Sequence, residues 1–265
     1  MSEVGVVIVA AGYGSFREVG ENPYPKVLEP LDQDGDRLVL TAVMEATTRS
    51  GCSPQILVLN GRDGDCICRT LVSRGFRGFH VVRQPWRLGA ADAIARALPV
   101  FEAEGAEDFL VVYGDMPLWR AETMRELVRH HRESNAMLSM VSVSIEAADH
   151  PAVLEKYGRV LRDAHGRIVG VVEPYEATVQ QLAETRRVNP SLWVFKRWWF
   201  AANLHLIQPK SKGDGFPPEF HTPNLVAIAA SVGAPITEMP LDRREEALGI
   251  NTVEELEEVR AIVAR

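Results

Sequence analysis

The sequence contains only three cysteines and no apolar run long enough to cross a membrane. Cys52, Cys66 and Cys68 are too few and too closely spaced for a disulfide framework. Cys66 and Cys68 have no second pair that would complete a zinc site, so we expect all three cysteines to be small buried filler. The longest apolar stretches have the length of strands, well short of the roughly 20 residues of a membrane helix.

Basic charge is also scarce. The 265 residues include 29 Lys and Arg against 36 Asp and Glu, which gives a formal net charge of −7 and a pI near 5.6. Because nucleic-acid backbones require a basic face, no nucleic-acid partner is expected. The first residues form neither a basic n-region nor an apolar signal, so the expected location is cytoplasmic, with no membrane partner.

Two common phosphate-binding loops are missing from the sequence. No Gly-x-x-x-x-Gly-Lys-Ser/Thr occurs, and Arg17 stands where a dinucleotide fingerprint would carry its third glycine. A dinucleotide fold also needs a helix directly after the glycines, and Gly20, Pro23 and Pro25 would interrupt that helix. Neither loop is therefore predicted, and the segment that follows the glycines is expected to be a long loop.

Strand-like runs of Val, Ile and Leu alternate with amphipathic segments of helix length through the first half of the chain. They predict strands over 4–11, 55–59, 78–82, 108–113 and 137–144 and helices over 39–49, 63–73, 89–102 and 121–133. This alternation indicates βαβ units. We therefore expect an α/β fold with a Rossmann-like, mostly parallel central sheet flanked by helices.

The second half has a different character. A hairpin is expected over 158–172, turning at 163–166, followed by a strand near 188–195 and a loop at 209–218. Thr252 and Glu255 predict a capping box at the start of a C-terminal helix.

A glycine-rich segment follows the first predicted strand. The apolar run 6–11 opens into Gly12-Tyr13-Gly14-Ser15, and Lys26 follows within Pro25-Lys26-Val27-Leu28. Glycines let consecutive N–H groups turn toward an anion, and open α/β sheets bind ligands at the carboxyl ends of their strands. The sequence thus predicts a nucleotide-phosphate site that Lys26 helps to neutralise, although any turn after a strand can use glycine.

Asp115 follows the predicted strand 108–113 at the same edge of the sheet. Mg²⁺ prefers one or two carboxylate or amide oxygens together with phosphate oxygens and water. Asp115 is therefore a candidate ligand for the magnesium of a bound triphosphate. The alternative is a turn-forming Asp before Met116-Pro117.

Taken together, these segments resemble the sugar-phosphate nucleotidyltransferases. The matching motifs are Val-Ala-Ala-Gly-x-Gly at 9–14, Pro-Lys-Val-Leu at 25–28 and Tyr-Gly-Asp-x-Pro-Leu at 113–118. The likeness is greatest to the uridylyltransferase domain of bifunctional N-acetylglucosamine-1-phosphate uridyltransferases. It continues in order through Gln84-x-x-x-Leu88-Gly89, Tyr157-Gly158-Arg159-Val160, Val171-Val172-Glu173, Val188-Asn189 and Gly249-Ile250-Asn251.

The resemblance implies a glycosyltransferase-A-like nucleotidyltransferase fold and a reaction between a nucleoside triphosphate, UTP in this likeness, and a sugar-1-phosphate. It implies Mg²⁺ as cofactor. Because the sequence lacks the family's trimer-forming repeat domain, we expect a monomer or homodimer. The resemblance also implies one domain over 1–265, divided into a nucleotide-binding part at 1–145, a β-rich sugar-binding part at 146–248, and a metal-ligand turn with the C-terminal helix at 249–265. It assigns the nucleotide to Ala10, Ala11, Gly12, Gly14, Gln84, Gly89 and Gly114, the sugar to Gly158, Glu173 and Asn189, the metal to Asp115 and Asn251, and catalysis to Arg17 and Lys26.

Three departures from the family leave the substrates open. Phe16 stands at the family's loop arginine, so we expect Arg17, one position later, to reach the β- and γ-phosphates in its place. The family's Leu-Gly-Thr-x-His-Ala becomes Leu-Gly-Ala-Ala-Asp-Ala at 88–93, and its Tyr-Tyr-Leu-Thr-Asp becomes Phe-His-Thr-Pro-Asn at 220–224. The alternatives are a guanylyl- or cytidylyltransferase for another phosphorylated acceptor, and a non-catalytic nucleotide-sugar sensor. No hexapeptide repeat is present, so only the nucleotidyl-transfer step is implied.

Overall fold

The computed structural model describes residues 3–19, 22–146, 151–211 and 217–265. Within these residues ten strands form one sheet, in the order β5-β4-β1-β6-β11-β7-β10-β8-β9, with β12 also paired to β7. The strands are β1 (Val4–Ala10), β4 (Gln55–Asn60), β5 (Phe79–Gln84), β6 (Asp108–Tyr113), β7 (Leu138–Ser144), β8 (Gly158–Arg162), β9 (Ile168–Val172), β10 (Arg187–Asn189), β11 (Trp193–Lys196) and β12 (Ile236–Pro240).

The first half of the sheet is parallel, as predicted. β5, β4, β1 and β6 pair in parallel, whereas β11 lies antiparallel between β6 and β7. β7, β10, β8 and β9 continue the sheet in antiparallel pairs. The chain leaves β1 toward β4 on one side and later returns to β6 on the other, so the crevice beside β1 is a topological switch point, where open α/β sheets bind ligands.

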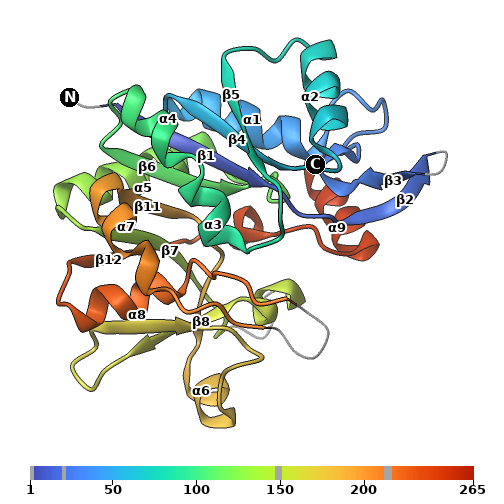
Figure 1. Cartoon of the computed structure of the whole chain (residues 1–265). Helices are drawn as coiled ribbons and strands as arrows, with labels where there is room; N and C mark the ends of the chain where they lie inside the picture. The colour runs from blue at the N-terminus through green and yellow to red at the C-terminus, as the bar shows by residue number, and fades with distance from the viewer. Residues whose placement is uncertain (1–2, 20–21, 147–150, 212–216) are drawn as a thin grey trace.

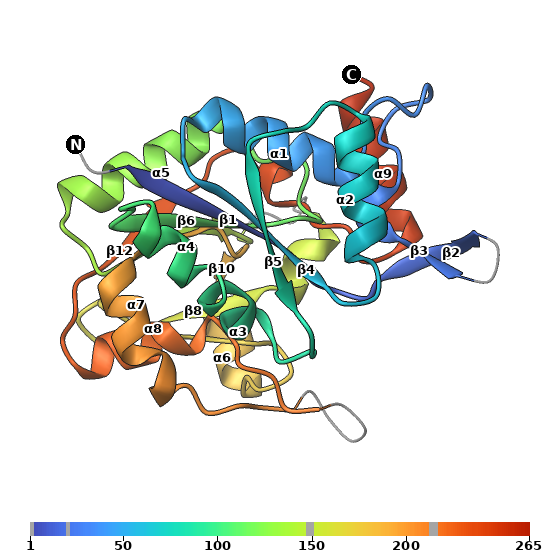
Figure 2. The ribbon, with the colours of Figure 1, turned by 45° about the horizontal axis from the view of Figure 1, so that its top comes forward.

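Helices cover both faces of the sheet (Figures 1 and 2). Alternate residues of β1 point to opposite faces: Val6 and Ile8 belong to one buried cluster and Val7 to the other. The first cluster includes residues of α1 (Val39–Ser50), α2 (Gly64–Ser73), α5 (Ala121–Glu133) and α9 (Val253–Val263). The second includes residues of α3 (Ala90–Ala95), α4 (Leu98–Ala103), α7 (Arg197–Asn203) and α8 (Asn224–Ser231).

Several predicted elements are confirmed. The five strands and the helices α1, α2 and α5 agree with the sequence within two residues, and the hairpin over 158–172 is formed by β8 and β9. Thr252 and Glu255 form the predicted capping box of α9. No helix among the described residues is long and apolar enough to cross a membrane.

Three predicted elements differ. The helix expected over 89–102 is two short helices, α3 and α4, because Pro99 lies in the first turn of α4 and has no N–H to continue α3. The strand near 188–195 is split into β10 and β11 by a turn in which Ser191 has φ +63°. The segment after the glycines, expected as a loop, contains a hairpin of β2 (Ser15–Val19) and β3 (Asn22–Pro25) that projects from the body (Figure 1).

A small helix, α6 (Val179–Glu184), lies at the end of the molecule formed by β8 and β9 (Figure 1). Its N-terminus is capped by Thr178, whose hydroxyl accepts from the backbone N–H of Gln181. Of the loop expected at 209–218, residues 212–216 lie outside the described part. Lys210 and Glu219 on its two sides bond each other's backbone.

Candidate active site

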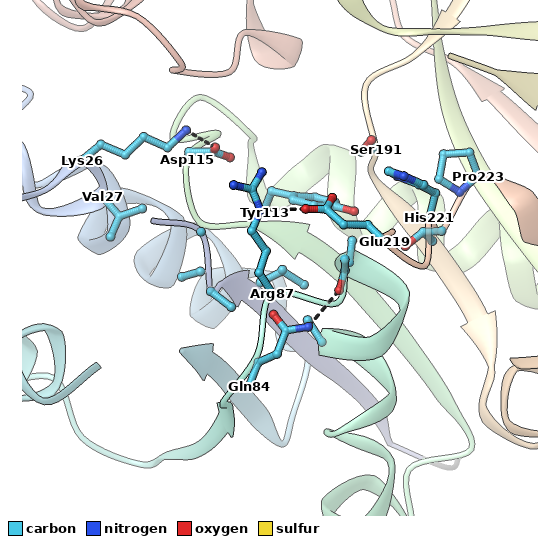
Figure 3. Close-up of a pocket in the computed structure, with 18 of the residues that line it drawn as sticks. Lys26, Val27, Gln84, Arg87, Tyr113, Asp115, Ser191, Glu219, His221 and Pro223 are labelled. Atoms are coloured by element: carbon cyan, nitrogen blue, oxygen red, sulfur yellow. Dashed lines mark hydrogen bonds and ion pairs between the residues drawn. The ribbon is translucent and has the colours of Figure 1, made fainter. Parts of the chain in front are cut away.

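A cavity of about 280 Å³ lies where the parallel strands end. Figure 3 shows Lys26 and Asp115 at one side of it, Ser191, His221 and Pro223 at the other, and Gln84 below. Its walls come from the ends of β1, β5 and β6, from α3 and from the segment that leads into α8. The lining residues are Val9, Ala10, Ala11, Gly12, Lys26, Val27, Gln84, Arg87, Gly89, Ala90, Ala93, Tyr113, Asp115, Glu173, Ser191, Glu219, His221, Thr222 and Pro223.

Lys26 joins three segments that are far apart in the sequence. Its Nζ donates to Asp115 Oδ2 at 2.6 Å, to the carbonyl of Ile250 at 2.6 Å and to Asn251 Oδ1 at 3.0 Å. The Lys26 side chain is 13% exposed and that of Asp115 is 25% exposed. Two hard oxygen donors, a carboxylate and an amide, therefore meet at one point beside the cavity, and Mg²⁺ prefers this donor set.

Backbone bonds hold these groups in place. Lys26 N–H donates to Gly14 O, and Gly114 N–H donates to Val9 O, which ties the end of β6 to the end of β1. Ile250 N–H donates to the carbonyl of Asp115 at 3.0 Å. Gly14 and Gly114, predicted to bind nucleotide, thus bond to Lys26 and Val9, which line the cavity, but do not line it themselves.

The turn that carries Asn251 has its own buried support. Glu255, which forms the capping box of α9 with Thr252, also accepts from the backbone N–H of Asn251 at 2.6 Å. Tyr157 donates to Ala247 O at 2.7 Å and accepts from Gly249 N–H at 3.0 Å. Burial raises the pKa of the Tyr157 phenol, so the group stays protonated and keeps donating at neutral pH.

Gln84 and Gly89 lie together at the opposite end of the cavity from the Lys26 cluster. Gln84 is the last residue of β5 and is 5% exposed, and its Nε2 donates to Gly89 O at 2.9 Å. Gly89 has φ +90°, and a Cβ there would lie 2.6 Å from Phe220 O. Only glycine fits where the 88–93 segment meets the segment at 220, which closes the cavity at this end.

The sequence reasoning missed several cavity residues that lie inside motifs it had used. Arg87 stands within the Gln84-to-Gly89 motif, and Tyr113 precedes Asp115. Glu219 pairs with Arg87 at 2.7 Å where their two segments are in contact at the cavity wall (Figure 3). Burial raises the pKa of Tyr113, and the charges of Glu173 and Asp115 raise it further, so its phenol is neutral at physiological pH. Residues 221–223 also line the cavity, and their departure from the family's sequence was the one sign of this in the sequence analysis.

The glycine loop is held from the side by the end of β4. Asn60 donates through Nδ2 to Gly12 O at 2.9 Å, and Arg62 donates to Tyr13 O at 3.2 Å while its guanidinium lies over the Tyr13 ring. Neither residue was singled out from the sequence, because nothing local to 60–62 marks a contact with residues nearly 50 positions earlier.

Arg17 lies in β2 and contacts Tyr24 of the neighbouring strand β3 and Glu29, which follows the hairpin. Its Nε donates to Glu29 Oε1 at 2.8 Å, and its guanidinium lies over the ring of Tyr24 at 4.2 Å. The role predicted for Arg17 at the phosphates requires this ion pair to open. Glu29 is 5% exposed, so such an opening would leave a buried carboxylate without this partner.

Of the predicted sugar-binding residues, Glu173 lines the cavity. Gly158 pairs with Asn189 across β8 and β10, and a Cβ on Gly158 would come 3.5 Å from Glu173 Oε1. Asn189 is 2% exposed, donates to Val141 O and accepts from Ser191 N–H. Asn189 therefore shapes the turn that presents Ser191 to the cavity, and its sugar-binding role stays a prediction.

Comparison with known proteins places this arrangement in a family. A family described as MobA-like NTP transferase domains matches residues 6–195, which include the glycine loop, Lys26, Gln84 and Asp115. The chain belongs to the MobA-like NTP transferase family. It is a nucleotidyltransferase domain, and the predicted likeness to such transferases is confirmed.

Among curated proteins, this MobA-like transferase is similar to bifunctional protein GlmU. The identity is 28% to the protein of Pelobacter propionicus, over 100% of this chain and 53% of that protein. It is 32% to the protein of Ralstonia nicotianae, over 99% of this chain and 52% of that protein. The chain therefore spans about half the length of the curated relatives that it matches.

Among solved structures, the MobA-like transferase is similar to a CMP:2-keto-3-deoxy-manno-octonic acid synthetase in complex with CTP. The TM-score is 0.63, and the match covers 99% of each chain at 16% sequence identity. At this identity the likeness concerns the fold, and it confirms the predicted nucleotidyltransferase architecture.

Proposed function

We propose that this domain transfers a nucleotidyl group from a nucleoside triphosphate to a sugar-1-phosphate such as N-acetylglucosamine-1-phosphate. Of the nucleoside triphosphates, we propose UTP. The observation that carries the proposal is the meeting of Lys26, Asp115 and Asn251 at one point beside the cavity. Three segments that the resemblance assigns to phosphates and metal are thus in contact, although they lie 89 and 225 residues apart in the sequence.

The reaction forms one bond and breaks one. An oxygen of the sugar phosphate attacks the α-phosphorus, and the bond from that phosphorus to the pyrophosphate oxygen breaks. A phosphate monoester is already a nucleophile near neutral pH, so the protein needs to align two polyanions and reduce their repulsion. Lys26 supplies a positive charge, and the N–H groups of the glycine loop supply dipoles for the phosphates.

The proposed magnesium ion would be held by Asp115 and Asn251. When bound there, it would supply charge that neutralises the triphosphate. Lys26, which occupies the point between these two oxygens, would then turn to the phosphates. On the acceptor side, Glu173 can accept hydrogen bonds from sugar hydroxyls, and the neutral phenol of Tyr113 can donate one.

The test is pyrophosphate release with magnesium, UTP and a panel of sugar-1-phosphates, with GTP, CTP, ATP and dTTP in parallel. Release with UTP and one sugar phosphate is the expected result. Lys26→Ala should lower turnover several hundredfold, the order seen when one donor to transition-state charge is removed. Arg49→Ala removes an exposed cation on α1 and is the matched control.

Two results would contradict the proposal. Near-normal turnover in Lys26→Ala would show that this lysine does not act on the phosphates. Binding of nucleotide or nucleotide sugar without pyrophosphate release under any combination would favour the sensor alternative, and release with another nucleotide alone would identify a different base.

A further inference from the structure

The amide of Gln84 has only one chemically sensible orientation. Its Nε2 lies 2.9 Å from Gly89 O and 2.8 Å from Asp92 Oδ2. A backbone carbonyl and an ionised carboxylate only accept hydrogen bonds, so the end of the amide that faces both must be the NH₂ group. The remaining end, Oε1, is an acceptor.

Asp92 is itself held in place. In α3 its two carboxylate oxygens accept from Arg96, Oδ2 from Nε at 2.8 Å and Oδ1 from Nη2 at 3.2 Å. The side chains of Asp92 and Arg96 are 20% and 30% exposed. The guanidinium keeps the carboxylate pointed at Gln84, because a charge-assisted fork contact restricts both side chains. If the Gln84 amide turned over, its oxygen would face this carboxylate and the carbonyl of Gly89.

We propose that Asp92 is a positioning residue for nucleobase selection: by fixing Nε2 of Gln84, it presents Oε1 to the base as an acceptor. The inference rests on the proposed function, in which the base lies against Gln84. It also gives a role to a position where the sequence departs from the family's Leu-Gly-Thr-x-His-Ala segment.

An acceptor at this place selects between pyrimidines. Uracil carries an N–H at its 3-position, whereas cytosine carries a ring nitrogen lone pair there, and single bases are read by hydrogen bonds along this edge. Gln84 Oε1 accepts from the uracil N–H and opposes the cytosine lone pair. The oriented amide therefore favours uridine over cytidine nucleotides.

The test is the ratio of the dissociation constants of CTP and UTP, measured by calorimetry with magnesium present. In Asp92→Asn the new amide can donate as well as accept, so only the carbonyl of Gly89 still disfavours the turned-over amide of Gln84. We expect the CTP-to-UTP ratio to fall about tenfold, the effect of one mismatched hydrogen bond. If the role of Asp92 were purely structural, Asp92→Asn would weaken the binding of both nucleotides alike and leave the ratio of their dissociation constants unchanged.

Two further variants isolate the route through Gln84. In Gln84→Leu the discrimination is lost, and adding Asp92→Asn to it should change the ratio no further. A further change in the double variant would overturn the inference, because Asp92 would then act on the base without Gln84. Glu45→Gln is the matched control, since Glu45 pairs with Arg49 four residues later on α1, distant from the cavity. If Asp92→Asn does not fold, Arg96→Met, which releases Asp92, replaces it.

The outcomes separate this inference from the proposed function. A wild-type preference for UTP with an unchanged ratio in Asp92→Asn overturns the inference alone. A wild-type preference for CTP overturns the inference together with the uridine assignment, because an oriented Oε1 acceptor at the 3-position of the base disfavours cytosine. Equal affinity of the wild type for CTP and UTP likewise overturns both the inference and the uridine assignment.

Discussion

Lys26 occupies the point between the two proposed metal ligands, so removing its charge should raise the affinity for a divalent metal ion. A divalent ion that binds without nucleotide must displace the Lys26 ammonium from Asp115 Oδ2 and Asn251 Oδ1. Lys26→Met keeps most of the buried side chain and removes the ammonium. We therefore expect the variant to bind the metal ion more tightly, although its turnover falls.

The magnitude follows from the contacts. Hydrogen bonds to charged groups contribute about 1.5–3 kcal/mol net where they are protected from water. The Lys26 and Asp115 side chains are 13% and 25% exposed, so solvent screens this pair only in part. Loss of the competing ammonium should accordingly tighten Mn²⁺ binding roughly ten- to hundredfold, since each 1.4 kcal/mol is about a factor of ten.

The assay is titration with Mn²⁺ in the absence of nucleotide, followed by electron paramagnetic resonance of the free ion. Asp115→Ala in the Lys26→Met background should abolish the tighter binding, which identifies the site. Arg49→Met, which changes the net charge equally at an exposed place on α1, should leave Mn²⁺ binding as in the wild type. Unchanged or weaker Mn²⁺ binding in Lys26→Met would refute the reasoning.

Two other predictions concern stability. Gly89→Ala should lower the free energy of unfolding by about 1–3 kcal/mol and weaken nucleotide binding, because φ is +90° and the new Cβ would lie 2.6 Å from Phe220 O. Gly61→Ala is the control, since a Cβ there meets nothing within 4 Å. Equal midpoints of urea unfolding for the two variants would contradict this prediction. Burial opposes ionisation of Asp108, but His131, Lys196 and Arg132 outweigh it and lower the pKa of its carboxyl from 3.8 to about 2. A lowered pKa in the folded state contributes stability above the unfolded-state pKa, and this stability is lost as the pH falls toward 2. The free energy of unfolding of the wild type should therefore fall by about 2 kcal/mol between pH 5 and 2, whereas that of Asp108→Asn should not show this fall. If urea unfolding gives the same pH dependence for both proteins, Asp108 does not have this role.

Much of the site was predictable because its motifs are local. Residues 9–14 lie at the end of a buried strand, and Asp115 follows another. The short apolar run before each of these segments is enough to predict where the strand ends and which residues follow it. The parallel register of β1 with β6 then brings these ends together, as the alternation of strands and helices predicted.

The errors have equally local causes. Pro99 divides a helix whose hydrophobic pattern continues across it, and the turn at Ser191 interrupts a run of strand-forming residues. At 99 the missing N–H of proline overrides a hydrophobic pattern that is averaged over many residues. At 191 the turn is stabilised by the hydrogen bond from Ser191 N–H to the side chain of Asn189. The hairpin after the glycines contains two prolines, Pro23 and Pro25, and a loop was predicted there because proline interrupts a helix and is rare inside strands.

The sequence by itself determined the α/β class, the two strand-end segments and the identity of the chemical groups, because these depend on periodicity and on residues that are neighbours in the chain. Only the tertiary structure decided what each group faces. Lys26 bonds to Asp115 and Asn251, Arg17 pairs with Glu29, and Gln84 turns its NH₂ group to Asp92. Such pairings depend on distances between segments that pack together, and these distances are a property of the folded sheet and not of any stretch of sequence.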